Sequence, residues 1–245
     1  MIDWLLRGRH EEPSVTVGGR ELPLAIRRHP RATRLTMRLA PDGSEVRITL
    51  PRWGRTLDAL VFVRNRTEWL ESQLAAVPRA APPAPGATLA YRGERLAIEW
   101  NPRLPRKPGL GEASIRLGGP EETVPGRIRR WLEAEALRLL GEDLAHYCAL
   151  AGRPLPEMRL SRAQRRWGSC SGQKADARCI RVNWRLVQAP DFVRRSVVAH
   201  EVAHLVHFDH SPAFRALLAG LFEGDIQAAD QWLRQEGRGL YAAFG

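Results

Sequence analysis

The chain of 245 residues can form one large domain or two small ones, and its content of 44% apolar and 27% charged residues is typical of a globular protein. No apolar run approaches the ~20 residues that a membrane span requires, and charge interrupts the N-terminus too early for a secretory signal, so we expect a cytoplasmic protein with no membrane partner. The net charge of +11 indicates either a surface that faces a polyanion or a bias of composition, because nearly all the basic residues are arginine and they are spread along the whole chain.

The first third of the chain predicts a β-rich region with one helix. Alternating apolar residues and turn signals indicate strands at 15–17, 22–27, 35–39 and 46–50. Thr56 can cap a helix that runs to about Ala76. The apolar stripe expected on this helix comprises Leu57, Leu60, Val61, Trp69, Leu70 and Leu74.

A run rich in proline and alanine follows, and it can sustain neither a helix nor a central strand. We therefore assign residues 1–79 to a β-rich N-terminal region, 80–87 to a linker and 88–245 to a second domain.

The second domain predicts a hairpin near 87–100, an exposed basic loop at 101–111 and a long helix from Thr123 to about Ala151. Short strand-like runs at 158–160, 166–170 and 179–184 precede three helices near 190–207, 211–222 and 225–236. No internal repeat is visible. The expected fold class is α+β, with a β-rich N-terminal half followed by a helical domain that contains a small sheet.

Four of the seven histidines lie within eleven residues, and the first two form an H-E-x-x-H motif with His200, Glu201 and His204. A spacing of four places both imidazoles on one face of a helix, one turn apart, where they can share one Zn²⁺. Glu201 lies about 100° around the helix, beside the metal, in the position of a general base for a metal-bound water.

A zinc hydrolase needs a third protein ligand and an open fourth position, and both His207 and His210 have a suitable side chain. If the helix continues to about Phe208, His207 lies roughly 10.5 Å along the axis from His200, which is too far for a common metal. His210 directly precedes an expected N-cap at Ser211, so the chain can turn there toward the metal.

Three segments in order resemble one family: R-R-W-G-S-C-S at 165–171, V-N-W-R-L at 182–186, and the histidine-rich run that ends at Phe214. They are similar to the motifs of the YgjP-like family, bacterial zinc metallopeptidases of the SprT-like or WLM type, with a catalytic core at about 158–236. The resemblance implies a zincin-like fold, the metal ligands His200, His204 and His210, and Glu201 as catalytic base. Val202 and Arg215 depart from the family pattern, in which Leu and Trp are usual.

Trp167, Gly168 and Ser169 can be understood in two ways. They form either an edge strand that holds a substrate peptide by main-chain hydrogen bonds, or a strand that packs against the metal-binding helix. Cys170 is expected to be a small buried hydrophobic residue, because the three cysteines Cys148, Cys170 and Cys179 form no close pair.

The sequence thus predicts a zinc-dependent metallopeptidase that cleaves a peptide or protein substrate. The residue types available to stabilise the oxyanion are Tyr91, Tyr147, Tyr241 and His207. Two alternatives stay open: a basic protein that acts on or binds at DNA or RNA, and a metal-binding module without turnover.

Overall fold

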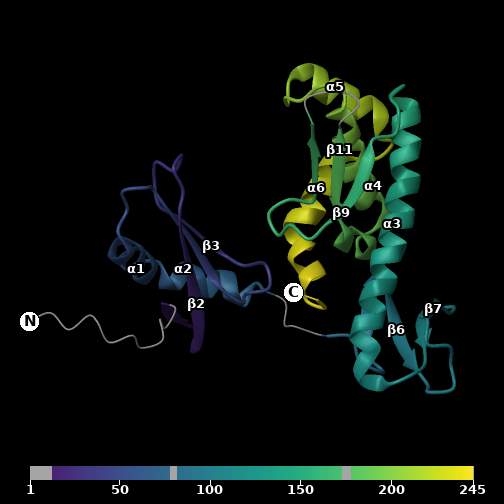
Figure 1. Ribbon diagram of the computed structural model, residues 1–245, viewed down its shortest axis with the longest axis horizontal. Coiled ribbons are helices and arrows are strands. Elements are labelled where there is room, and N and C mark those ends of the chain that lie inside the picture. Colours follow the sequence, from purple (N-terminus) through teal and green to yellow (C-terminus); the bar gives the residue numbers. More distant parts are fainter. Residues whose placement is uncertain (1–12, 78–81, 173–177, 245) are drawn as a thin grey trace, which may run out of the picture. The chain divides into compact units, whose positions relative to one another are not determined.

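The computed structural model describes residues 13–77, 82–172 and 178–244 (Figure 1). The chain forms two compact units, Met1–Arg79 and Ala80–Gly245. Both combine strands and helices, so the α+β class is confirmed. The expected linker at 80–87 lies partly outside the described residues; residues 82–87 have neither helix nor strand, and the assignment stays a prediction.

The first unit is a four-stranded sheet with two helices. The strands are β1 (Ser14–Val17), β2 (Arg20–Arg28), β3 (Thr36–Leu39) and β4 (Val46–Leu50), in the order β1-β2-β4-β3. The two hairpins pair antiparallel, whereas β2 and β4 are parallel. Val46, Ile48 and Leu50 alternate toward the core of this unit, as the pleat of a half-buried strand requires.

The single helix expected from Thr56 to Ala76 is wrong. The structure has two helices, α1 (Thr56–Arg64) and α2 (Thr67–Ala75), because the backbone of Arg66 leaves the helical region at φ −131° and ψ 23°. The break also changes which side faces the core: Ala59, Val63 and Leu70 are buried. Three members of the expected stripe are exposed instead, namely Leu57, Val61 and Trp69.

The second unit opens with another four-stranded sheet and a long helix. The strands are β5 (Thr88–Tyr91), β6 (Glu94–Trp100), β7 (Gly109–Leu110) and β8 (Ser114–Leu117). No strand is expected from the sequence at β8, and β7 lies within the segment 101–111 that is expected to be a loop. A short 3₁₀ turn then leads into α3 (Val124–Leu150), whose bounds are close to those expected. Gly152, with its φ of +59°, follows the C-cap residue Ala151.

The two four-stranded sheets share one topology, although the sequence shows no repeat. The second sheet has the order β5-β6-β8-β7, with antiparallel outer pairs and a parallel central pair, as in the first sheet. Strand order and direction are therefore repeated without a sequence period that would reveal them.

The remainder of the second unit carries the histidine-rich segment. A three-stranded sheet of β9 (Glu157–Ser161), β10 (Gly168–Ser171) and β11 (Cys179–Asn183) has the order β10-β11-β9. The helices α4 (Asp191–Ala203), α5 (Pro212–Leu221) and α6 (Ile226–Gln235) follow. Figure 1 shows α3 running beside both β9 and α4, and its buried face supplies Ile128, Leu132 and Leu140 to their common core.

Among the helices that the structure describes, none combines the length and apolar character needed to cross a membrane.

Candidate metal centre and active site

An ion-pair network holds the helix of the H-E-x-x-H motif in place. Arg194 on α4 bonds to Asp143 on α3 through Nε and Oδ2 at 2.7 Å, and the two side chains are only 3% and 5% exposed. Arg195 adds a bond to the same carboxylate at 3.4 Å. Because both charges of the main pair are buried and mutually satisfied, the network fixes the orientation of α4 against α3.

The structure brings His200, His204 and His210 together. His200 Nε2 lies 3.1 Å from His204 Nε2 and 3.3 Å from His210 Nε2, and the possible ligand atoms of the three residues all lie within 4.8 Å of one another. Two nitrogens bound to a tetrahedral zinc at 2.0–2.1 Å are about 3.3–3.4 Å apart. The nitrogens therefore have nearly the spacing that a bound zinc requires.

The expected end of α4 near Phe208 is wrong, since the helix stops at Ala203 and His204 is its C-cap. His207 therefore lies outside the helix, and the axial argument against it loses its premise. Its side chain is nevertheless not one of the three that converge, which are those of His200, His204 and His210 among the described residues. The backbone carbonyl of His207 takes another role, because it lies 2.9 Å from His204 Nδ1.

The backbone carbonyl of His207 determines the tautomer of the His204 ring. A carbonyl oxygen can only accept, so Nδ1 of His204 must carry the proton and donate it. Nε2 of the neutral ring then presents its lone pair toward His200 and His210, as a metal ligand must. Burial, reinforced by the neighbouring His204 and His210, lowers the pKa of His200 to about 4, so this ring is also neutral at physiological pH.

Phe214 packs against all three imidazoles. Its ring is stacked on His204 at 4.5 Å and meets His200 and His210 edge-on at 5.0 and 4.9 Å between ring centres. Phe214 itself is held by the first turn of α5, where its backbone N–H donates to the N-cap side chain of Ser211. The cap and proline at the start of α5 thus position the aromatic wall of the cluster.

Glu201 lies beside the cluster and is 5% exposed. Its Oε2 has no hydrogen-bond partner among the described residues. Burial raises the pKa of the carboxyl to about 7, although the backbone N–H of Cys170 and the charge of Arg166 act in the opposite direction. A buried carboxyl with this pKa and one free oxygen can both accept and release a proton near neutral pH.

Gly168 on β10 makes room for this carboxylate. A Cβ at position 168 would overlap Oε1 of Glu201, so no other residue fits without displacing the acid. The glycine in the R-W-G-S motif therefore marks the close approach of strand and helix.

The three residues Trp167, Gly168 and Ser169 stand at the edge of the small sheet. β10 pairs with β11 on one side and has no strand partner on the other among the described residues. Trp167 packs on Tyr241, with ring centres 5.8 Å apart. Cys170 is half-buried, not fully buried as expected, and burial raises the pKa of its thiol.

A cavity of about 210 Å³ opens beside His200 and Glu201. Trp167, Gly168, His200 and Glu201 line one part of it. Ser196, Val197 and Asp230 also line the cavity. Three apolar residues of the last two helices complete it, namely Leu218, Ile226 and Leu233. Sequence reasoning missed these three residues, because their helical periodicity is that of ordinary core positions.

The three tyrosines considered for the oxyanion have other partners. Tyr91 donates to Glu135 and Tyr147 donates to Glu223, each at 2.8 Å. The hydroxyl of Tyr241 lies 3.3 Å from the carbonyl of Ala163. Each of the three hydroxyls therefore has a hydrogen-bond partner that is not part of the histidine cluster.

Together, the H-E-x-x-H helix, the third histidine and the buried glutamate are the arrangement of a metallopeptidase. A family model described as YgjP-like, metallopeptidase domain, matches residues 33–236. The chain belongs to the YgjP-like family. Searches of curated proteins and of solved structures give no significant match.

Proposed function

We propose that the protein is a zinc-dependent peptidase that hydrolyses peptide bonds at the histidine cluster. The observation that carries this proposal is the placement of a buried carboxylate with one unpartnered oxygen next to three converging imidazole nitrogens. His200, His204 and His210 would hold the metal, and three neutral imidazoles suit Zn²⁺. When bound, a zinc ion polarises the substrate carbonyl and lowers the pKa of its water to about 7.

Glu201 moves the proton in this reaction. Its Oε2 accepts a proton as the oxygen of water attacks the peptide carbonyl carbon. The same oxygen returns the proton to the amine nitrogen when the C–N bond breaks, so the carboxylate is regenerated. The pKa of about 7 matches this dual task, because proton uptake and release are then both accessible at neutral pH.

We place the substrate along β10. An extended peptide can add to the open side of this strand through main-chain hydrogen bonds, with Gly168 and Ser169 offering backbone groups. The adjoining cavity of about 210 Å³ would accept one apolar side chain of that peptide between Trp167 and α6.

The test is digestion of casein or a peptide library by the zinc-loaded protein and by Glu201→Gln. Glutamine keeps the shape of the side chain but cannot accept the proton, so we expect zinc content near one per chain in both proteins and a rate about 10²–10⁴-fold lower in the variant. Equal rates would show that Glu201 is not the base. A wild-type protein that binds zinc but cleaves nothing would instead support a metal-binding module without turnover.

A further inference from the structure

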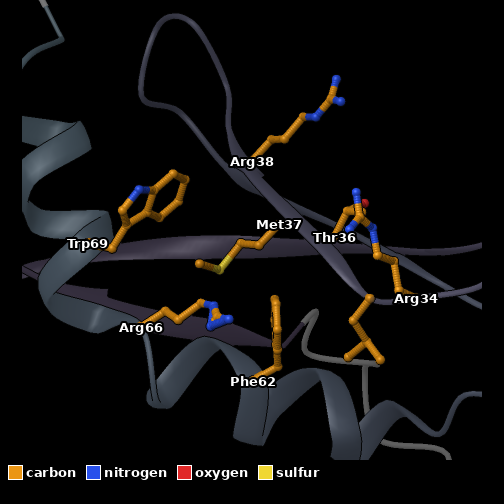
Figure 2. Close-up of a pocket in the computed structure, with 8 residues that line it drawn as sticks. Arg34, Thr36, Met37, Arg38, Phe62, Arg66 and Trp69 are labelled. Carbon is orange, nitrogen blue, oxygen red and sulfur yellow. The ribbon is translucent and has the colours of Figure 1, made fainter.

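The first unit contains a groove that is separate from the histidine cluster. It lies between the edge strand β3 and the helices α1 and α2, and it has a volume of about 660 Å³. This volume is in the range of clefts that bind ligands. Its walls carry Arg34, Met37, Arg38, Phe62, Arg66 and Trp69 (Figure 2).

Aromatic rings face this groove. Trp69 on α2 is 43% exposed, and Phe62 on α1 is half-buried with the guanidinium carbon of Arg66 4.3 Å from its ring centre. Figure 2 shows the side chain of Met37, on β3, between those of Trp69 and Phe62. Burial of a tryptophan side chain removes a large apolar area from water and so stabilises a fold. The exposed ring of Trp69 is therefore available to a ligand in the groove.

The groove is strongly basic. Arg34, Arg38 and Arg66 are exposed and form no ion pair among the described residues, and no acidic side chain lines the groove. Residues 13–77 hold eleven arginines against six acidic residues, so the whole unit repels cations and attracts anions.

We propose that this groove binds single-stranded nucleic acid. Unpaired guanidinium groups contact phosphates, and exposed aromatic rings stack on bases that are not already paired. A duplex keeps its bases stacked inside and would use the arginines alone. An acidic peptide would likewise satisfy the arginines, but it would leave Trp69 and Phe62 without a matching planar group.

The experiment measures the binding of a fluorescein-labelled oligonucleotide of about 12 residues to the full-length protein by anisotropy, over a range of salt concentrations. RNA and DNA single strands form two arms, and the corresponding duplex and an oligoglutamate peptide are competitors. We expect single strands to bind more tightly than the duplex, with an affinity that falls as salt rises.

Matched variants separate the groove from general charge. Trp69→Ala is compared with Trp53→Ala, a tryptophan of the same unit that is 75% exposed and lies outside the groove. Loss of one stacking ring should weaken binding roughly 5- to 150-fold for Trp69→Ala and leave Trp53→Ala close to wild type.

The second pair of variants removes equal charge. In a single strand, each arginine that neutralises one phosphate contributes about −0.7 to the slope of log affinity against log salt. Arg34→Gln/Arg38→Gln should therefore reduce the magnitude of this slope by about 1.4. Arg52→Gln/Arg64→Gln removes the same two charges outside the groove and should change the slope far less. Equal effects within either pair, or stronger binding of the duplex or of oligoglutamate, would overturn the proposal. Peptidase activity need not be present for any of these measurements, so they succeed or fail independently of the proposed function.

Discussion

At the scale of single residues, the approach of Gly168 to Glu201 gives the sharpest test of the site. In Gly168→Ala the new methyl group would overlap Oε1 of Glu201, and the carboxylate would have to leave its position. We expect zinc to remain bound and peptide hydrolysis to fall by about 10²-fold or more, since misplacement of a reacting group by 1 Å has an effect of this size. Metal analysis and digestion of the same preparation measure both quantities. Wild-type activity in this variant would show that the strand can yield and that the close approach has no catalytic role.

The two histidines after the helix should differ in their effect on zinc. His210→Ala removes a side chain of the cluster, so we expect a severe loss of zinc affinity. His207 contributes only its backbone carbonyl to His204, and alanine keeps that carbonyl, so His207→Ala should bind zinc nearly as the wild type does. Titration with a zinc chelator ranks the two variants. The reverse order would move the third ligand to His207.

Much of this site is visible in the sequence, because residue type and spacing within one helix determine where His200, Glu201 and His204 point. The role of His207 is not visible. It depends on where α4 ends, and a backbone carbonyl carries no residue-specific signal. The placement of His210 required the chain to turn back, which spacing alone permits but does not impose.

At the scale of elements, the buried ion pair between Asp143 on α3 and Arg194 on α4 should strongly affect the stability of the second unit. Asp143→Ala leaves Arg194 buried without its main partner, so we expect a loss of about 3–5 kcal/mol in the free energy of unfolding. The double variant Asp143→Leu/Arg194→Met replaces both charges with apolar groups and should recover most of this loss. Denaturant unfolding of the three proteins gives the values. A single variant as stable as the wild type would mean that Asp191, which bonds to Arg194 at 2.5 Å, compensates fully for the lost carboxylate.

Elements with strong local signals were predictable, and those set by tertiary context were not. The long helix α3 follows from its periodic apolar residues and from Gly152 at its end. The break at Arg66 has no proline or glycine to announce it. It arises because α1 and α2 each bury a separate set of residues against the first sheet, a choice made by packing and not by helix propensity.

At the scale of the whole molecule, the segment that matches the family model does not have the same boundaries as either compact unit. The matched segment 33–236 begins inside the first unit and includes part of its sheet, so the family pattern does not coincide with one compact unit. Each unit nevertheless has a hydrophobic core of its own, with no residue in common. The shared sheet topology shows that the fold can repeat where the sequence does not, because strand order depends on pairing and not on residue identity.

The two separate cores predict two thermal transitions in the full-length protein, of which only one responds to zinc. All residues of the histidine cluster belong to the second unit, so zinc at about 100 times its dissociation constant should raise that unit's transition by about 5–10 °C and leave the other unchanged. Matched core substitutions assign the transitions: Ile48→Ala in the first unit and Ile128→Ala in the second, both fully buried, should each lower one transition by several degrees. Differential scanning calorimetry of these proteins, with His204→Ala as the control that lacks a ligand, makes the comparison. A single transition that shifts with zinc and with either substitution would mean that the two units unfold together and are not independent folding units.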